Sequence, residues 1–342
     1  MKYISIDNVE PGQFLGKTIY SGNGTILLSA GVQLTVYMIS TLNRIGVTML
    51  YIQDPLFDDV ETSDMLSEAT KQGILQEMSN VYESIRSGKK WNTQSIGSSV
   101  ESLLRDVISN KELLVQLTDI RTKDNNEYIH AMNVCLLSSV MGINMGFNYL
   151  QLKELAMGAL LHDIGKSGMT KEYKHLPKTH HTWRGFEKLK SKRELSLLIA
   201  HVALQHHERI DGLGVPRGLT GNKIHRYAKI VSAADTYERL IHPISSEAKM
   251  LLPHEACEEM MTMSEKQLDY EVLFQFNRVV SIYPIGTAVR LSTKETGIVV
   301  GQHRGLPGRP VIRIVQGEAS NFDIKELDLA QETTVFIEAV LT

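Results

Sequence analysis

The stretch ELAMGALLHDIGK, from Glu154 to Lys166, decides how this sequence is interpreted. It is an apolar run with helical spacing that leads directly into His162 and Asp163, two residue types that bind metal ions. Adjacent residues of an α-helix point about 100° apart, so both can hold one ion only where the helix ends. Gly165 provides a helix stop there. We therefore expect a helix that ends at a metal-binding pair, with Asp163 able to give one oxygen to each of two ions.

The composition limits the classes of protein to consider. The chain has 342 residues, enough for two or three domains, and its 42% hydrophobic and 22% charged residues are typical of a globular protein. A net charge of −3 gives no general attraction to nucleic-acid polymers or membranes, so an anionic ligand needs local positive charge. The start of the chain lacks the apolar region of a signal peptide. The most apolar stretch, residues 131–147, is short for a membrane span and predicts a buried helix.

Cysteine usage indicates a cytoplasmic protein. Cys135 and Cys257 are far apart in the sequence and have neither metal-ligand spacing nor the pattern of a disulfide framework. We expect both to be buried thiols.

The pattern of apolar residues changes along the chain and indicates four parts. Residues 1–60 alternate short strand-like runs with turns such as SGNG at 21–24, followed by a helix from Thr35 to Gly46, which predicts a small α+β module. Residues 61–118 contain amphipathic helices that form a linker. Their apolar faces either form a homodimer surface or pack within the chain. Residues 119–278 form a helical core, and residues 279–342 a small β-rich extension with a turn at 294–297. The fold class is thus multidomain and mainly α.

Further candidate metal ligands occur on both sides of the opening stretch. They are His130 in NEYIHAMNV, His181 in THHTWRG, His206 and His207 in QHHE, and Asp235 in IVSAADTYE. Asp235 follows an apolar helical run, where a carboxylate is costly to bury without a cation or a hydrogen-bonding partner. Imidazole and carboxylate ligands together suit Fe, Mn, Zn or Ni.

Taken in order, these motifs resemble the HD-GYP family of the HD phosphohydrolase superfamily. The shared pattern includes the His-Asp pair with Lys166, His181 with Gly185, the HHE motif, and the loop DGLGVPRGLTG at 211–221. The segments ISIDNVEPGQFLGKTIY and YPIGTAVRLS also resemble modules that flank this domain in some members. The resemblance implies an all-helical HD-type core and hydrolysis of cyclic di-GMP to linear pGpG. It implies a binuclear metal centre with a bridging hydroxide.

The resemblance also assigns the ligands by position. His130, His162, Asp163 and Asp235 would bind one ion, and a second would be bound by Asp163, His181 and His206 with His207 close by. Two divalent ions are expected, Fe or Mn in first place and Zn or Ni as alternatives. Asp163 and Lys166 are the expected catalytic residues, with Lys166 stabilising phosphate charge or, alternatively, only complementing a helix end.

The substrate side is expected to involve the glycine-rich loop and nearby cations. The candidate substrate-binding residues are Lys166, Arg184, Gly214, Pro216 and Arg217. Glu208 and Asp211 are expected to support the site without binding metal or substrate directly. Glu208 either orients a ligand histidine or lies on the surface.

Three departures from the family pattern concern recognition. Val215 stands where the loop has tyrosine, so an aromatic ring and its hydroxyl are missing. Asn126 stands where some members have a glutamate for a third metal, which predicts two ions and not three. After Asp235, Ile244 and Glu247 take places where basic residues are usual.

The leading hypothesis is a metal-dependent cyclic di-GMP phosphodiesterase, whose activity these departures could lower. One alternative is a catalytically weak or inactive sensor or scaffold for the same nucleotide. Another is a hydrolase of a different cyclic dinucleotide or nucleotide phosphate. The expected partners are the cyclic dinucleotide, a second copy in a homodimer, and proteins that bind the N-terminal module, but neither a nucleic-acid polymer nor a membrane.

Overall fold

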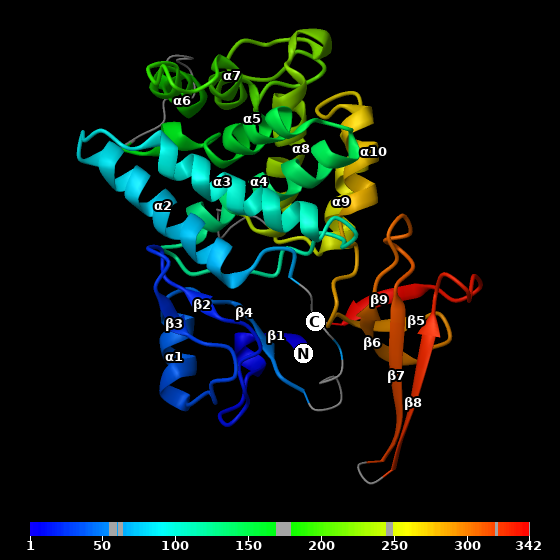
Figure 1. The fold of residues 1–342 in the computed structure, drawn as a ribbon. Coiled ribbons are helices and arrows are strands. Elements are labelled where there is room, and N and C mark those ends of the chain that lie inside the picture. Colours follow the sequence, from blue (N-terminus) through cyan, green and yellow to red (C-terminus); the bar gives the residue numbers. More distant parts are fainter. Residues whose placement is uncertain (55–59, 61–63, 169–178, 244–248, 319–320, 342) are drawn as a thin grey trace.

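The computed structural model describes residues 1–54, 60, 64–168, 179–243, 249–318 and 321–341. In Figure 1 a mainly helical core lies above an N-terminal module, in blue, and a C-terminal sheet, in orange and red. Within the described residues, no helix is long and apolar enough to cross a membrane.

The N-terminal module combines two small sheets with one helix. Its elements are β1 (Lys2–Ser5), β2 (Ile19–Tyr20), β3 (Ile26–Leu28), α1 (Val36–Arg44) and β4 (Met49–Ile52). Strands β1 and β4 pair antiparallel, and β2 and β3 form a hairpin around the SGNG turn. Helix α1 begins after Thr35, whose hydroxyl accepts a hydrogen bond from the Met38 amide at 3.2 Å. Gly46 follows the helix with a φ of +94°, in the left-handed region that favours glycine.

The helical core is built around a helix that is buried on nearly all sides. The helices are α2 (Glu68–Arg86), α3 (Thr93–Ser109), α4 (Asn126–Asn144), α5 (Tyr149–Leu160), α6 (His181–Lys190), α7 (Leu197–Gln205), α8 (Arg226–Ile241), α9 (Pro253–Thr262) and α10 (Tyr270–Val279). Helix α4 contacts α2, α3, α5, α8 and α10. It contains residues 131–144 of the stretch 131–147 that was expected to be a buried helix, so that expectation is confirmed except for the last three residues, which lie beyond the helix end.

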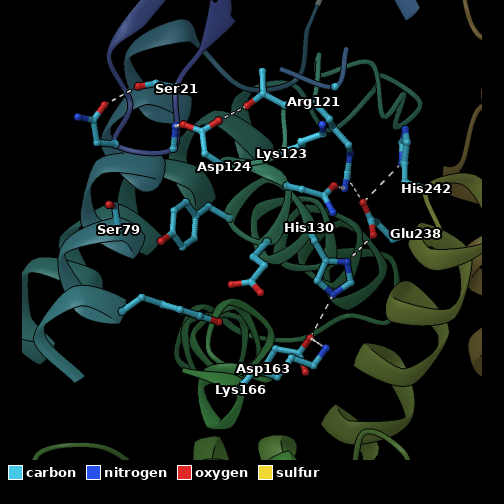
Figure 2. Close-up of a pocket in the computed structure, with 18 of the residues that line it drawn as sticks. Ser21, Ser79, Arg121, Lys123, Asp124, His130, Asp163, Lys166, Glu238 and His242 are labelled. Carbon is cyan, nitrogen blue, oxygen red and sulfur yellow. Dashed lines mark hydrogen bonds and ion pairs between the residues drawn. The ribbon is translucent and has the colours of Figure 1, made fainter. Parts of the chain in front are cut away.

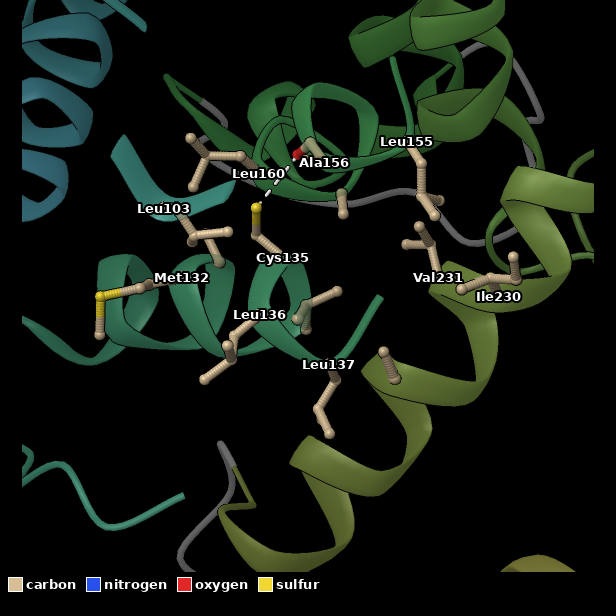
Figure 3. Packing of buried hydrophobic residues seen from close by; sticks show 14 of the residues in the cluster. Leu103, Met132, Cys135, Leu136, Leu137, Leu155, Ala156, Leu160, Ile230 and Val231 are labelled. Atoms are coloured by element: carbon tan, nitrogen blue, oxygen red, sulfur yellow. Dashed lines mark hydrogen bonds between the residues drawn. The ribbon is translucent and has the colours of Figure 1, made fainter. Parts of the chain in front are cut away.

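Packing around α4 is apolar and includes one thiol (Figure 3). Leu103 of α3, Leu155 of α5 and Val231 of α8 are all fully buried there. A fully buried side chain of this size contributes about 1.5–3 kcal/mol to stability. Cys135 lies among them, and its burial raises the pKa of the thiol to about 12. Both cysteines are buried and unpaired, as expected.

The C-terminal region is a five-stranded antiparallel sheet in the order β8-β7-β6-β5-β9. Its strands are β5 (Ala288–Leu291), β6 (Thr296–Gly301), β7 (Val311–Glu318), β8 (Asn321–Asp328) and β9 (Ile337–Leu341). The turn between β5 and β6 covers residues 292–295, two positions earlier than expected, with Lys294 at a φ of +72°. Gly297 lies within β6, where a Cβ atom would stand 2.6 Å from the Ile312 side chain. Glycine is therefore needed there for close packing and not for a turn.

The N-terminal module contacts the core through the segment before α4. The Asn125 side chain donates a hydrogen bond to the Tyr20 carbonyl at 2.7 Å, and the Gly22 amide donates to Asp124 at 2.9 Å. Ile120 packs into the apolar cluster of the module. These contacts place the β2–β3 hairpin beside the start of α4.

Buried and half-buried charges strengthen the same junction. The Lys71 amine of α2 lies 2.7 Å from an Asp64 oxygen and 2.9 Å from an Asp119 oxygen. Lys17 of the module lies 2.6 Å from the other Asp64 oxygen. The lysines and carboxylates alternate, so each charge has an opposite partner.

Candidate metal centre

Five segments of the core bring the expected metal ligands together. His130 lies in the first half of α4, His162 and Asp163 follow α5, and Asp235 lies in α8. His181 is the first residue of α6, and His206 caps the C-terminal end of α7, followed by His207. Helix α4 packs on α5 and α8, and α6 packs on α7 and on the turn after α5. The ligands therefore meet because the helices that carry them are neighbours.

The opening stretch forms the centre of this arrangement. Helix α5 ends at Leu160, and a 3-10 turn, η3 (Ile164–Lys166), follows Asp163. The ring of His162 is oriented by a contact of 2.7 Å between its Nδ1 and the Ala159 carbonyl, which leaves Nε2 facing the other ligands. Gly165 has a different role from the expected helix stop. A Cβ atom there would lie 1.9 Å from the His181 carbonyl oxygen, so glycine allows α6 to approach the turn.

The ligand atoms form two groups that share Asp163. The first group is His130, His162, Asp163 and Asp235, and the second group is Asp163, His181, His206 and His207; within each, the ligand atoms lie within 4.8 Å of one another. Asp163 offers Oδ2 to the first group, 3.4 Å from His162 Nε2. It offers Oδ1 to the second group, 3.2 Å from His181 Nε2 and 3.6 Å from His206 Nε2. One carboxylate thus lies between the two groups.

The second group leaves a buried oxygen that suits a metal ion. Asp163 Oδ1 has no hydrogen-bond partner, although two imidazole nitrogens lie near it. An unsatisfied buried carboxylate oxygen is costly, and a cation coordinated by all three groups would satisfy it. Burial lowers the pKa of His206 to about 4, so its ring is neutral, the form that binds metals. The residues therefore fit divalent transition metals.

Charge also favours the ionised form of the shared carboxylate. Burial disfavours the charge of Asp163, but His162, Lys166 and Arg239 hold the pKa of its carboxyl well below the usual range. Asp163 is therefore a carboxylate at neutral pH, as a bridging ligand must be.

A carboxylate that sequence reasoning missed stands behind His130. Glu238 of α8 is buried and forms a hydrogen bond to His130 Nδ1, and Arg121 in turn pairs with Glu238. Such a carboxylate fixes the orientation of a ligand imidazole and raises its basicity. The available signal was an acidic residue three positions after Asp235, on the same face of a helix.

Two cations contact the first group. Arg239, which sequence reasoning also missed, donates from Nε to Asp235 Oδ1 at 2.7 Å and from Nη2 to Asp163 Oδ2 at 3.0 Å. The amine of Lys166 donates to the same Asp163 oxygen at 2.5 Å. Lys166 thus contacts the carboxylate that the two groups share.

The larger cavity opens between the core and the N-terminal module (Figure 2). It has a volume of about 1350 Å³, and His130, Asp163 and Lys166 line its inner end. The turn at 21–25 and Lys123 line the opposite side. The first group of ligands is therefore reached from a space that the module helps to enclose.

A smaller cavity, of about 280 Å³, lies on the side of the second group. His206, His207, Gly214 and Val215 are among its lining residues. A Cβ atom on Gly214 would lie 2.2 Å from the Arg209 amide nitrogen, so glycine lets the loop pass close to the HHE motif. Val215 is 44% exposed at the position where the resemblance implies tyrosine.

The expected roles of Glu208 and Asp211 need correction. Both oxygens of the buried Glu208 accept hydrogen bonds from loop amides, those of Arg217 and Leu219, each at 2.8 Å. Glu208 therefore holds the loop and does not orient a ligand histidine. Asp211 is exposed and accepts hydrogen bonds from the Arg209 guanidinium, at 2.6 Å, and from the Leu213 amide. It therefore stabilises a turn of the loop and lies outside the two ligand groups.

Three expected substrate-binding residues lie apart from the cavities. Arg217 is exposed on the loop, and the peptide bond between Val215 and Pro216 is cis. Arg184 lies on α6. The described linings of both cavities contain none of the three.

The other departures fall partly outside the described residues. Asn126 lines the larger cavity and accepts a hydrogen bond from Arg121 at 2.8 Å, while Glu127 is more than half exposed and 3.8 Å from Arg86. Within the described part of the chain, neither residue belongs to a group of ligand atoms that could hold a metal ion. Ile244 and Glu247 lie outside the described residues.

The chain is similar in sequence to several known phosphodiesterases. The chain is 27% identical over 260 residues to a cyclic di-GMP phosphodiesterase of Pseudomonas aeruginosa, covering 72% of this chain and 61% of the relative. It is 32% identical over 179 residues to a cyclic di-GMP phosphodiesterase of Thermotoga maritima, covering 48% and 47%. A 3'3'-cGAMP-specific phosphodiesterase of Vibrio cholerae is 27% identical over 146 residues, covering 40% and 33%. The chain thus spans less than two thirds of each of these relatives.

Family models cover the core and the sheet separately. Residues 288–342 match a KOW domain associated with the HD domain, which accounts for the C-terminal sheet. Residues 102–272, half of the chain, match the HD domain, and they contain every ligand of the two groups. The chain belongs to the HD domain family.

Proposed function

We propose that this chain is a metal-dependent phosphodiesterase that hydrolyses cyclic di-GMP to linear pGpG at a binuclear centre. The observation that carries the proposal is the position of Asp163, which directs one oxygen into each of two ligand groups. The names of the relatives support cyclic dinucleotides as the substrate class.

The residues of the chain would divide the work as follows. Two ions held by the two groups would clamp a phosphodiester and lower the pKa of a water between them. Glu238 would hold His130 in the orientation that ligation needs. Lys166, on the cavity side of Asp163, would stabilise negative charge on the phosphate as a point cation.

We place the substrate in the larger cavity. Ligand pockets for small molecules commonly measure roughly 300–1,000 Å³, and this cavity, of about 1350 Å³, has room for a dinucleotide. Four cations line it, Arg86, Arg121, Lys123 and Lys166, beside four carboxylates, Asp124, Glu127, Asp163 and Glu238. The positive charge available to phosphates is therefore local to the cations and is not a net charge of the cavity. The N-terminal module would then contribute to substrate binding as well as to any partner contacts.

The test is an assay of the purified full chain loaded with Mn or Fe. Cyclic di-GMP and 3'3'-cGAMP are incubated with it, and products are separated by chromatography, with Asp163→Asn as the matched inactive variant. We expect a linear dinucleotide from the wild-type protein and none from the variant. No turnover of either substrate, with bound metal demonstrated, would sink the proposal.

Val215 favours a second candidate, a sensor that binds the nucleotide with little hydrolysis. An aliphatic side chain replaces the loop tyrosine beside the second group, while the ligands themselves are kept. Calorimetry that detects cyclic di-GMP binding by a metal-loaded protein without turnover would support the sensor. Restored turnover in Val215→Tyr would assign the loss to this residue.

A further inference from the structure

The two ligand groups differ in the cations around them. Both carboxylates of the first group, Asp163 and Asp235, accept hydrogen bonds from Arg239. The second group uses the other oxygen of Asp163, and in the described part of the chain no hydrogen bond reaches that oxygen. The shared carboxylate is thus neutralised on one side and open on the other.

We propose that Arg239 is an internal cation that holds the first group closed to metal, so that the second group binds its ion first and more tightly. The proposal rests on the metal centre of the proposed function. In this account the second ion enters the first group only by displacing the guanidinium of Arg239.

Competition follows from the atoms involved. Arg239 Nε lies 2.7 Å from Asp235 Oδ1, the same oxygen that is 3.1 Å from His130 Nε2. An ion bound by His130 and Asp235 must approach that oxygen to roughly 2.0–2.2 Å. The guanidinium and the ion would then repel each other across a buried oxygen where water screens little. Hydrogen bonds between charged partners are also the stronger kind, so their loss opposes entry of the ion.

Arg239 has the freedom to leave. Its side chain is 25% exposed, and it lies near the end of α8, two residues before Ile241. Lys166, at 27% exposed, lies on the cavity side and contacts the same Asp163 oxygen. Of these two cations, Arg239 contacts both carboxylates and Lys166 is paired with Asp163, so removal of Arg239 is the sharper test.

Metal binding without substrate provides that test. Metal-free full-length protein is titrated with Mn²⁺ by calorimetry, and bound Mn is counted after desalting. We expect the wild-type chain to keep one ion after desalting and to bind a second at least about tenfold more weakly. Arg239→Ala and Arg239→Gln should strengthen the second ion by about tenfold or more, since a charged hydrogen bond is lost from the competing state. Arg239→Gln keeps a donor and serves if the alanine variant is unstable.

Two controls locate the effect. Arg226→Ala removes an arginine from the same helix that pairs with the exposed Glu271, so it should titrate like the wild type. His206→Ala should lose the tightly bound ion, while His130→Ala should retain it. Circular dichroism and unfolding curves establish that each variant is folded.

The outcomes separate this inference from the proposed function. The inference would be overturned if the wild-type chain bound two ions with equal affinity, or if neither Arg239 variant bound the second ion more tightly. Either result would count even if the protein hydrolyses cyclic di-GMP. A tight ion lost in His130→Ala but kept in His206→Ala would overturn it as well. Binding of no Mn²⁺ by any variant would overturn the metal centre and the inference together. If Mn²⁺ binds as expected but cyclic di-GMP is not hydrolysed, the inference is supported and only the proposed phosphodiesterase activity is contradicted.

Discussion

At the scale of residues, the centre depends on a carboxylate, Glu238, that is not one of the grouped metal ligands. Glu238 bonds His130, is buried, and is held by Arg121. Its charge and its geometry both act on the imidazole, because a carboxylate acceptor fixes the ring and makes its other nitrogen more basic.

We expect Glu238→Gln to weaken the ion in the first group by about 10–100-fold, because a neutral amide is a poorer acceptor. Mn²⁺ titration followed by calorimetry measures this. Glu271→Gln, at an exposed site of the same core, is the matched control and should leave both affinities unchanged. Equal affinities in Glu238→Gln and the wild-type chain would contradict a role for Glu238 in positioning His130.

Some side-chain positions of the site could be predicted from the sequence, and others could not. The histidines and aspartates of both groups were named from their order along the chain, and the helices bring them together. Glu208 was misplaced because adjacency to His207 does not reveal that its oxygens turn toward the loop amides. Arg239 follows Asp235 by one helical turn, but its contact with Asp163 depends on how α5 packs beside α8.

At the scale of elements, glycines set how closely α6 approaches the turn after α5. The sequence predicted the helix that carries the His-Asp pair, but it attributed the wrong role to Gly165. Strand β8 was also missed, because its run NFDIKELD mixes charged and apolar residues without a clear strand signal. Tertiary contacts, which periodicity does not encode, decide both cases.

Gly165→Ala should therefore destabilise the core by about 1–3 kcal/mol, the usual cost of forcing extra atoms into a packed site. Gly73→Ala is the matched control, since Gly73 lies inside α2 with open space around it. It should stabilise the chain by roughly 0.5–1 kcal/mol, because alanine loses less backbone entropy than glycine in a helix. Urea unfolding of both variants gives the comparison, and equal midpoints would show that the close approach to His181 does not matter.

At the scale of the whole molecule, a chain of charges joins the N-terminal module to the core. Lys71 lies between Asp64 and Asp119, and Lys17 reaches Asp64 from the module. Burial disfavours the charged form of Asp64, but the two lysines hold the pKa of its carboxyl below the usual value. Its contribution to stability is therefore complete above about pH 4 and is lost as acid protonates it at lower pH.

Lys71→Met leaves two acidic groups without their shared cation, so we expect a loss of about 3 kcal/mol in the free energy of unfolding. Thermal and urea unfolding at neutral pH measure it. Lys89→Met, at an exposed position just after the same helix, should change stability by less than about 0.5 kcal/mol. A similar small change in both variants would contradict a structural role for the charge chain.

The larger cavity makes the module part of the proposed substrate site. Lys123 lines it opposite Lys166, so Lys123→Glu should weaken binding of cyclic di-GMP by about tenfold through repulsion of its phosphates. Calorimetry with Asp163→Asn, which prevents turnover, measures the affinity. Lys89→Glu carries the same change of charge away from the cavity and should bind normally. Equal affinities in the two lysine variants would place the substrate elsewhere.

The central claim is that Asp163 gives one oxygen to each of two metal ions. Anomalous diffraction from crystals soaked in saturating Mn²⁺ tests it most directly. We predict two peaks on either side of the Asp163 carboxylate, roughly 3.5–4 Å apart, one beside each ligand group. A single peak that contacts only one of the groups at saturation, or no peak at Asp163, would contradict the account.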